Sequence, residues 1–306
     1  MSSPTSPETP ESPETAQATA AEAPAPEAPP AETPAATAEA ATTASTPAPA
    51  PAPSAARRAT ESAIRIVWIY PDLLSTYGDQ GNALIMAYRA QARGHQVERI
   101  DVRSDQPVPV DADVYLIGGG EDRPQRLAAE RLRRDPGLAK AVGRGASVLA
   151  VCAGFQIFGH TFIDDRDEAE PGLGLLDVSS HRGTVRCVGE VASTPDRTLL
   201  LGGAPLPTFT GFENHMGTTQ LGPLTRPLGA TTLGNGNGPG TGAEGGWQGR
   251  IIGTYLHGPV LARNPAIADL LLSWVDGRDE PTAADDTWPT KLRAERLGVA
   301  KQPAKA

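Results

Sequence analysis

The stretch Ser147-Val-Leu-Ala-Val-Cys-Ala-Gly-Phe-Gln-Ile-Phe-Gly159 carries the strongest structural signal in the sequence. Ser147–Val151 is a short apolar run typical of a buried strand, and it leads into Cys152, small residues and an amphipathic helical stretch. This pattern predicts a nucleophile elbow, a sharp turn from strand to helix that holds the nucleophile clear of the backbone. A thiol there would lie at a helix N-terminus, where the helix dipole and free N–H groups favour the thiolate.

The same segment also has a structural interpretation. Free cysteine packs like a small hydrophobic residue, so a buried structural cysteine explains the pattern equally well. If the elbow is functional, the Ala153 N–H at the start of the helix is expected to hold a developing oxyanion. The rest of the chain has to decide between the two.

The N-terminal segment differs in composition from everything after it. Residues 1–62 consist almost entirely of Ala, Pro, Thr, Ser and Glu, without an aromatic residue, and contain 13 of the 30 prolines. Such a segment cannot bury enough apolar surface to offset its ordering entropy, so a disordered, flexible tail is expected. It has no basic region followed by an apolar core, which argues against a secretory signal.

Charge and cysteine content exclude several classes of protein. Seven glutamates precede Arg57, so residues 57–306 carry only −2 of the formal charge of −9 (−9 minus −7). This nearly neutral part has no basic stripe for nucleic acid and no apolar run of membrane-spanning length. Two cysteines, Cys152 and Cys187, indicate a reducing cytosol and argue against a disulfide or a Cys-rich metal site.

Strand-like and helical stretches alternate through the first half of residues 63–277, which we expect to form one domain. The expected strands are Ile64–Tyr70, Gln96–Val102, Val114–Ile117 and Ser147–Val151, and the expected helices are Ala83–Gln91, Arg123–Arg134 and Leu138–Val142. This alternation predicts an α/β fold with a mostly parallel sheet flanked by helices. The carboxyl ends of such strands build the active site, and Gly118–Gly120 and Cys152 both lie at that edge.

After Gly172 the pattern changes to shorter strand-like pieces separated by turn residues. The expected elements are strands at Gly183–Val188, Thr208–Glu213 and Arg250–Leu256, a loop or hairpin tip at Asn235–Gly242, and a closing helix at Asn264–Trp274 capped by Asn264. Residues 278–306 form a polar tail with at most one short helix near Lys291–Leu297. This tail could contact a partner.

A cysteine nucleophile needs a base, and the sequence offers His95, His160, His181, His215 and His257. His257 directly follows a buried-looking strand and precedes Gly-Pro, which places it on a fixed turn at a sheet edge. His215, in Gly-Phe-Glu-Asn-His, is the second candidate. A structural or surface role is the alternative for any lone histidine.

The residues after His257 include no acid to orient it, because Gly258, Pro259 and Val260 follow. Either a distant residue such as Glu213 serves, or the third member of the triad is missing from this chain. The triple glycine at 118–120 offers further N–H groups, and that of Gly119 is expected to complete the oxyanion hole. A plain tight turn is the alternative, and no G-x-x-x-x-G-K-[ST] motif for ATP occurs.

Six ordered segments carry a family resemblance. They are Tyr77–Asn82, Ile117–Gln125, Cys152–Gln156, Gly172–Asp177, Gly211–His215 and Gly253–Pro259. In this order they resemble the class I glutamine amidotransferases of the cobyric-acid-synthase-like (CobB/CobQ-like) branch, which have a flavodoxin-like fold. Within that branch they are most similar to the glutaminase subunits of lipid II isoglutaminyl synthases. The resemblance covers about residues 64–275 and leaves out the N-terminal tail.

The resemblance implies roles for individual residues. Cys152 would be the nucleophile and His257 its base, and Arg186 and Gln156 would bind the substrate, L-glutamine. An arginine suits the substrate carboxylate because its fork binds both oxygens. Pro259 stands where most class I enzymes have the acid of the triad. The same replacement is typical of this branch, and the resemblance implies that the partner subunit supplies the acid. The chain alone is therefore expected to be weakly active.

The resemblance also implies a partner. Ammonia would pass within a heterodimer to a Mur-ligase-like (MurT-type) synthetase subunit, which would bind ATP and Mg²⁺ and amidate the D-glutamate of the lipid II stem peptide to D-isoglutamine. No cofactor is expected on this chain, and its location would be cytoplasmic, near the inner face of the membrane. Two alternatives are a stand-alone γ-glutamyl or DJ-1-like cysteine hydrolase and a non-catalytic thiol-sensing binding module.

Overall fold

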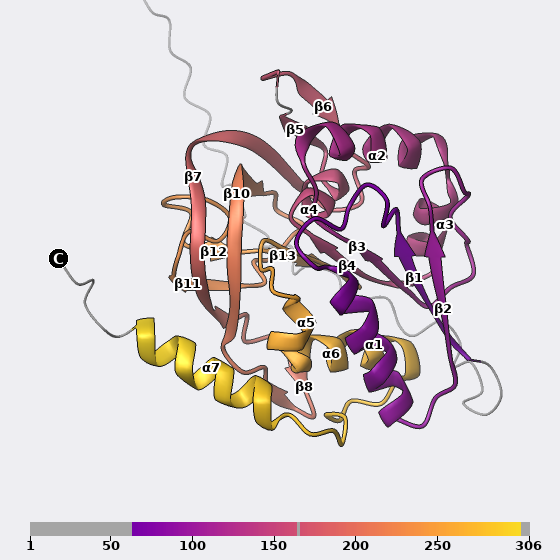
Figure 1. Cartoon of the computed structure of the whole chain (residues 1–306), viewed down its shortest axis with the longest axis vertical. Coiled ribbons are helices and arrows are strands. Elements are labelled where there is room, and N and C mark those ends of the chain that lie inside the picture. The colour runs from indigo at the N-terminus through magenta and orange to yellow at the C-terminus, as the bar shows by residue number, and fades with distance from the viewer. Residues whose placement is uncertain (1–62, 164–165, 301–306) are drawn as a thin grey trace, which may run out of the picture. The chain divides into compact units, whose positions relative to one another are not determined.

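The computed structural model describes residues 63–163 and 166–300 of the 306-residue chain. The predicted disorder of residues 1–62 lies outside the described residues, and so does the end of the chain after Ala300. Figure 1 shows the arrangement of the helices and strands.

A six-stranded sheet forms the centre of the fold. Its strands are β1 (Ile64–Ile69), β2 (Val97–Val102), β3 (Val114–Ile117), β4 (Ser147–Val151), β13 (Gly246–Gln248) and β14 (Ile251–Thr254), in the order β13-β14-β4-β3-β1-β2. All neighbours are parallel except β13 and β14. β3 and β4 are buried along their whole length, as expected for strands covered on both faces. The predicted α/β fold with a mostly parallel sheet is confirmed.

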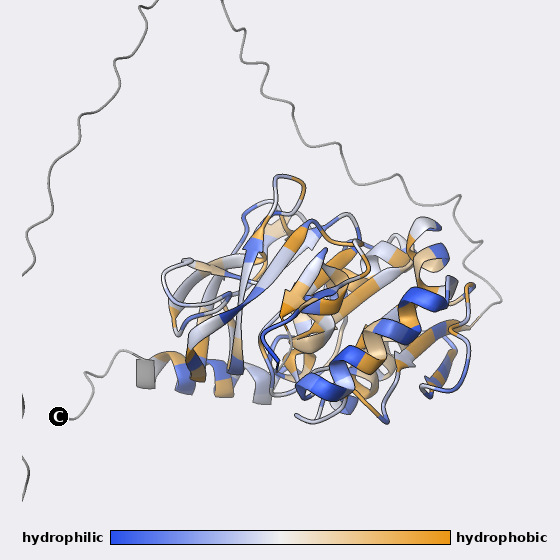
Figure 2. Ribbon diagram, turned by 90° about the horizontal axis from the view of Figure 1, so that it is seen from above, coloured by the Kyte–Doolittle hydropathy of each residue, from blue (hydrophilic) through white to orange (hydrophobic). Residues whose placement is uncertain are grey.

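Helices cover both faces of this sheet. The helices of the described residues are α1 (Gln80–Ala92), α2 (Asp122–Arg134), α3 (Gly137–Gly143), α4 (Ala153–Phe158), α5 (Val260–Arg263), α6 (Pro265–Asp276) and α7 (Thr287–Ala300), of which α7 packs against α5 and β10. Helices α1 and α6 contact each other on one side, and α2 contacts α4 on the other (Figure 1). Apolar residues concentrate on the central strands and the inward helix faces (Figure 2). Helix α1 begins three residues before the predicted start, because Gly81 and Asn82 belong to its first turn.

A second sheet, not predicted as such, lies beside the first. Its core is the antiparallel pair β7 (Val178–Pro195) and β10 (Phe209–Leu221), and β5 (Thr161–Ile163), β6 (Ala169–Pro171), β11 (Gly229–Leu233) and β12 (Ala243–Glu244) extend it. β8 (Leu200–Leu201) and β9 (Ala204–Pro205) form a separate hairpin. The sequence indicated only short pieces here, because glycines and exposed polar residues interrupt the alternation of these long strands.

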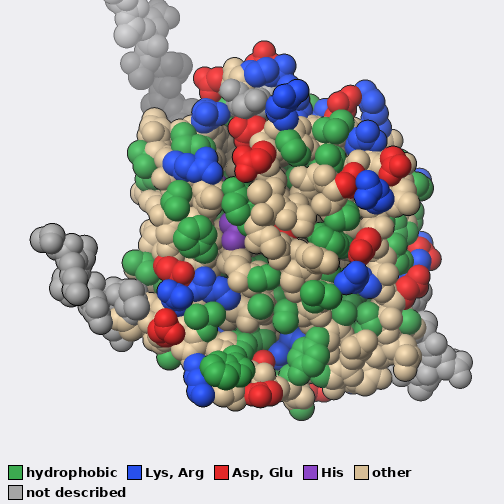
Figure 3. All heavy atoms as spheres, viewed as in Figure 1, with side chains coloured by type: hydrophobic (Ala, Val, Ile, Leu, Met, Phe, Trp, Pro, Cys, Tyr) green, Lys and Arg blue, Asp and Glu red, His purple; other side chains and the backbone are tan. Residues whose placement is uncertain are grey.

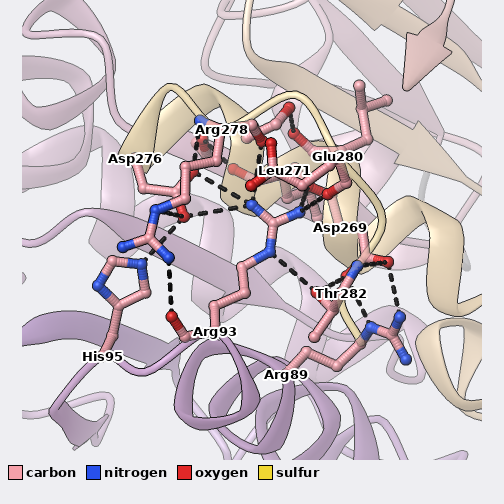
Figure 4. Close-up of polar contacts among 12 residues, drawn as sticks. Arg89, Arg93, His95, Asp269, Leu271, Asp276, Arg278, Glu280 and Thr282 are labelled. Carbon is pink, nitrogen blue, oxygen red and sulfur yellow. Dashed lines mark hydrogen bonds and ion pairs between the residues drawn. The ribbon is translucent and has the colours of Figure 1, made fainter. Parts of the chain in front are cut away.

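Two expectations near the C-terminus need correction. The side chain of Asn264 makes no capping bond to α6; its oxygen accepts the Thr210 N–H at 2.9 Å and its nitrogen donates to Thr210 O at 2.8 Å, so it ties the helix to β10. The segment after residue 277 is also more than a polar tail. Thr282 is buried among arginine and aspartate side chains (Figure 4), and α7 extends over 14 residues.

Charged side chains are distributed without a dominant sign. On the face seen in Figure 3, basic and acidic residues are interspersed. Within residues 63–163 and 166–300, no helix has both the length and the apolar character needed to cross a membrane.

Candidate active site

The turn at Cys152 has the strained geometry of a nucleophile elbow. Cys152 joins β4 to α4 with φ 53° and ψ −108°, a conformation that residues with a Cβ rarely adopt. Its N–H donates to Thr254 O on the neighbouring strand at 2.8 Å. A Cβ at Gly154 would lie within 3.0 Å of Ile117 O, so only glycine fits there without a shift. The predicted sharp turn from strand to helix is therefore present.

His257 lies beyond the end of β14 and is 2% exposed. Its backbone exchanges two hydrogen bonds with Phe212, of 2.8 and 3.2 Å, which fixes the residue against β10. The Tyr77 ring lies 4.6 Å from the imidazole, centroid to centroid. A carboxylate also faces the ring: Asp79 Oδ1 is 3.6 Å from His257 Nδ1, and Asp79 is likewise 2% exposed.

Three side chains converge on Gly119. A Cβ on this glycine would lie 2.8 Å from His257 Cε1, 3.2 Å from Cys152 Cβ and 3.4 Å from Asp79 Oδ2. Nucleophile, base and carboxylate are thus brought together from β4, β14 and the start of α1. Any side chain at position 119 would collide with them.

Electrostatics favour the charged form of His257. Burial alone would lower its pKa, but interactions with Asp79 and Cys152 outweigh burial and raise the pKa of His257 to about 10. At 3.6 Å the contact with Asp79 is a close ion pair and longer than a hydrogen bond. Neither ring nitrogen of His257 has a hydrogen-bond partner among the described residues. An imidazolium held in this way can give a proton to a leaving group.

The two predicted oxyanion donors, the N–H groups of Gly119 and Ala153, differ in their hydrogen bonding. The Gly119 N–H donates to Asp79 Oδ2 at 2.6 Å, so it holds the carboxylate in place. Binding an oxyanion through this N–H would first require that bond to break. The Ala153 N–H, at the first position of α4, has no acceptor among the described residues. Gly120 lines the cavity above Cys152.

A polar cavity of about 110 Å³ opens over Cys152. The start of α2 contributes Glu121 and Asp122 to its lining, and β7 contributes His181, Arg182 and Arg186. Arg186 Nε donates to Asn214 Oδ1 at 3.0 Å, which steadies the guanidinium at the rim. The cavity lining therefore contains both acidic and basic groups.

Gln156 lines the same cavity, but its side chain is held by protein groups. Gln125 Nε2 donates to its oxygen at 2.7 Å, and its nitrogen donates to Tyr255 Oη at 2.9 Å. Tyr255 in turn bonds Thr219 Oγ1 at 2.7 Å. These contacts make Gln156 part of the cavity wall, and direct substrate binding by its side chain stays a prediction.

The other histidines have different surroundings. His215 is buried, stacks on Tyr255 at 3.9 Å, and its Nδ1 lies 2.7 Å from Gly217 O. His160 contacts Asp177, and His95 contacts Asp276. Glu213, the distant acid considered for the triad, accepts the N–H groups of Asn235 and Gly236 instead.

Sequence reasoning missed Asp79 and Tyr77, the two residues of Tyr77–Asn82 that face His257. From the sequence, this segment was identified only as part of the family resemblance. A usable signal existed, because the segment follows β1 at the carboxyl edge of the sheet and contains an acid. Within the described residues, no group of His, Cys, Asp and Glu is arranged to hold a metal ion.

The comparisons with known proteins agree with this geometry. A family model described as "CobB/CobQ-like glutamine amidotransferase domain" matches residues 65–265. "Lipid II isoglutaminyl synthase (glutamine-hydrolyzing) subunit GatD" of Staphylococcus aureus is 34% identical over 203 residues, which cover 66% of this chain and 79% of that protein. The subunit of the same name from Streptococcus pneumoniae is 31% identical over 214 residues, covering 69% and 79%. Cobyric acid synthase of Sphingopyxis alaskensis is 32% identical over 202 residues, covering 62% and 38%.

Proposed function

The chain belongs to the CobB/CobQ-like glutamine amidotransferases, and we propose that it is the glutaminase subunit of a lipid II isoglutaminyl synthase. In this proposal it hydrolyses L-glutamine to glutamate and ammonia, and a second subunit uses the ammonia. The observation that carries the proposal is the convergence of Cys152, His257 and Asp79 on Gly119, beneath a cavity with charges of both signs.

The first half-reaction releases ammonia. The Cys152 thiolate attacks the side-chain amide carbon of glutamine, forming a C–S bond and an oxyanion, which the Ala153 N–H is positioned to receive. His257, in its charged form, gives a proton to the amide nitrogen, the C–N bond breaks, and ammonia leaves. A γ-glutamyl thioester remains on Cys152.

The second half-reaction restores the thiolate. His257, now neutral, takes a proton from water as the oxygen attacks the thioester carbon. The C–S bond breaks, glutamate is released, and the Cys152 thiolate again faces an imidazolium. The proton given to ammonia is thus replaced by one from water.

The cavity supports recognition of an amino-acid zwitterion. The guanidinium of Arg186 suits the α-carboxylate, because its fork can bind both oxygens. Glu121 and Asp122, which also line the cavity, suit the α-ammonium group. Substrate held by these groups would direct its side-chain amide toward Cys152.

The partner is inferred from the relatives. Two relatives are named as subunits of an enzyme that acts on lipid II. The present sequence contains no P-loop motif for ATP. We therefore propose a heterodimer in which a Mur-ligase-like (MurT-type) subunit binds ATP and Mg²⁺ and amidates the stem-peptide D-glutamate. This reaction belongs to peptidoglycan synthesis and would occur in the cytoplasm, at the inner face of the membrane where lipid II is made.

The test is a glutaminase assay on the protein purified from its native cell with and without the ligase subunit that co-purifies. Glutamate release from L-glutamine is expected to rise on addition of the ligase subunit and to vanish in Cys152→Ala, since the nucleophile is lost. Ammonia release that survives Cys152→Ala would overturn the assignment.

The same assay separates the alternatives. Full turnover by the chain alone, unaffected by the ligase, would indicate a stand-alone cysteine hydrolase. Failure of an electrophilic glutamine analogue to label Cys152 would indicate a binding or thiol-sensing protein. Covalent labelling of Cys152 by that analogue, blocked by L-glutamine, is the result expected here.

A further inference from the structure

The turn that carries His257 is held through its backbone. His257 exchanges two backbone hydrogen bonds with Phe212 on β10, whereas neither ring nitrogen has a hydrogen-bond partner among the described residues. The place of the imidazole relative to Cys152 is therefore set by the backbone of the turn and by packing against Tyr77. Any group that holds this turn also sets the distance over which protons are transferred.

The glycine that follows the base leaves room for an arginine side chain. Gly258 has φ +130°, a conformation that residues with a Cβ rarely adopt, and a Cβ there would lie 2.8 Å from Arg263 Cδ. Arg263 is the last residue of α5, and its side chain folds back against the backbone of the turn. Arg263 is buried, with 6% of its surface exposed.

The guanidinium of Arg263 bonds a carboxylate on β7. Its Nη2 donates to Glu190 Oε2 at 2.6 Å. Glu190 lies directly opposite Phe212 in the β7/β10 ladder. The segment from His257 to Arg263 is thus tied to β10 through the backbone of its first residue and to the facing position of β7 through the side chain of its last residue.

Stability alone is a weak reason for this ion pair. A buried ion pair gives little net stabilisation, because both charges lose hydration when they are buried. Arg263 Nε also has no hydrogen-bond partner among the described residues, which adds to the cost of burying the guanidinium. The arrangement is better explained by the turn that it holds in place.

The C-terminal helix α7 supports both members of the pair. It packs against α5 and against β10. Arg293 Nη2 donates to the backbone oxygen of Arg263 at 3.3 Å, and Arg296 Nε lies 3.9 Å from Glu190 Oε1. The segment after residue 277 therefore contributes to holding the bridge.

The start of α1 holds the same segment at its middle. Gly81 packs directly against Pro259, and any side chain there would collide with the proline ring. Asn82 Oδ1 accepts the Leu261 N–H at 3.0 Å. These contacts leave the end of the segment to be fixed by the bridge from Arg263 to Glu190.

We infer that Arg263 is a positioning residue for the base: its bridge to Glu190 holds the turn at 257–259, so that His257 stays within proton-transfer distance of Cys152 and the substrate. The inference rests on the proposed glutaminase function. Arg263 does not line the cavity over Cys152, so it acts through the backbone of the turn. This role is separate from that of the acid that orients the ring, which the family resemblance places on the partner subunit.

The test measures glutaminase kinetics of Arg263→Met in complex with the ligase subunit. Methionine keeps an unbranched stem against Gly258 and removes the guanidinium, and Glu190, whose side chain is 30% exposed, can then be hydrated. Arg226→Met is the matched control, because Arg226 also pairs with one carboxylate, that of Asp196 at 2.9 Å, and does not line the cavity. Thermal melts verify folding, and gel filtration verifies that each variant binds the ligase subunit.

In Arg263→Met we expect kcat to fall by about 10–100-fold with KM for L-glutamine within about threefold of wild type, because a displaced base slows proton transfer and leaves the substrate-binding groups in place. Arg226→Met should keep the wild-type kcat. Arg263→Lys restores a cation on a similar stem, so its kcat should be at least about threefold higher than that of Arg263→Met.

Glu190→Gln tests the same bridge from its other end, at a half-exposed position that tolerates the change if Arg263→Met does not fold. If the two residues act as one bridge, the double variant Arg263→Met/Glu190→Gln should be no slower than the slower single variant, since the bridge can be lost only once. Losses in kcat that multiply in the double variant would overturn the bridge as their cause.

The outcomes separate this inference from the proposed function. A kcat of Arg263→Met within about threefold of the wild-type value would overturn the role of Arg263 while Cys152→Ala remained inactive. A raised KM at unchanged kcat, or loss of binding to the ligase subunit, would also overturn it, because the pair would then serve substrate or partner binding. An active Cys152→Ala variant would instead remove the proposed function itself.

Discussion

At its first turn helix α1 presents Asp79 to the buried ring of His257, and at its last turn it places Arg89 and Arg93 among carboxylates of the C-terminal segment (Figure 4). Both clusters are buried and charged, but their hydrogen bonding differs. Arg89 bonds Asp269 through two nitrogens, at 2.7 and 2.6 Å, and Asp286 at 2.8 Å.

The cluster at the last turn is saturated. Arg93 Nε donates to Thr282 Oγ1 at 2.9 Å, and its other nitrogens bond Asp276 and backbone carbonyls. At the first turn, Asp79 Oδ1 and both nitrogens of His257 have no hydrogen-bond partner among the described residues. Buried polar groups are normally paired, and unpaired ones cost free energy. The unpartnered atoms of Asp79 and His257 are therefore available to exchange protons with a bound substrate.

The largest effect is expected for His257→Ala, which tests whether the unpartnered polar atoms at the first turn of α1 serve catalysis. If the open atoms serve catalysis, kcat for glutamine hydrolysis should fall by about 10³-fold or more, because both proton transfers pass through this ring. The melting temperature should fall as well, because the substitution removes the charge partner of buried Asp79. Steady-state glutaminase assays and thermal melts on the same preparation measure both. Residual kcat within tenfold of wild type would assign the cluster a structural role.

The second substitution, Arg89→Ala, probes the saturated end. It leaves Asp269 buried without its main partner, so the free energy of unfolding should fall by about 3–5 kcal/mol. The kcat of the folded protein should stay within about threefold, because Gly81 and Asn82 hold the start of α1 independently.

Urea unfolding at pH 7 measures the stability change. The matched control is Arg134→Ala, which removes an ion pair with Glu130 that is largely exposed on α2 and should cost less than about 1 kcal/mol. If both variants lost the same free energy of unfolding, burial of the Arg89–Asp269 pair would add nothing to its contribution to stability.

Some parts of the site could be predicted from the sequence and others could not. The elbow at Cys152 and the turn at His257 follow from local pattern, because a strand, a small residue and a helix start are adjacent in the chain. The pairing of Asp79 with His257 joins residues 178 positions apart (257 minus 79), and no local pattern encodes it. It follows from the order of strands in the sheet, which brings the loops after β1 and β14 to one edge.

The same reason explains the other misses. Thr282 and Asp286 meet Asp269 and Arg89 only in the folded protein, so the segment after residue 277 was predicted to be a polar tail. The long β7/β10 ladder was seen as short pieces, because its glycines and half-exposed positions hide the alternation. Arg186 was identified through the family resemblance alone, and the structure puts it at the cavity.

A third substitution, Glu244→Gln, tests how a buried carboxyl group with an unpartnered oxygen makes the stability depend on pH. Glu244 is fully buried beside the strand that precedes His257, and its Oε2 has no hydrogen-bond partner among the described residues. Burial, opposed by hydrogen bonds from Thr254 and Tyr255, raises the pKa of Glu244 from 4.5 to about 7. Between these values the folded protein keeps a proton that the unfolded chain has lost, so stability falls as the pH rises through this window.

The rise in the pKa of Glu244 from 4.5 to about 7 corresponds to about 3 kcal/mol of unfolding free energy, which is lost as the pH rises through this interval. Glutamine does not titrate, so the difference in unfolding free energy between Glu244→Gln and wild type should grow by about this amount from pH 4.5 to pH 8, in favour of the variant. Urea unfolding across this range measures it, and the titrations of groups that do not interact with Glu244 cancel in the difference. A difference independent of pH would contradict the raised pKa.

The smallest expected effect concerns an open group at the rim of the site, Arg186. Its Nε donates to Asn214, and its other N–H groups have no acceptor among the described residues, so a substrate carboxylate would complete its bonding. Arg186→Lys should raise KM for L-glutamine by about 10–100-fold and leave kcat nearly unchanged, because lysine loses the two-point contact while the chemistry lies at Cys152. Arg197→Lys, at an exposed position outside the cavity, is the control and should keep the wild-type KM. A fall in kcat at constant KM would contradict this prediction. It would mean that Arg186 stabilises the transition state and does not only bind the substrate.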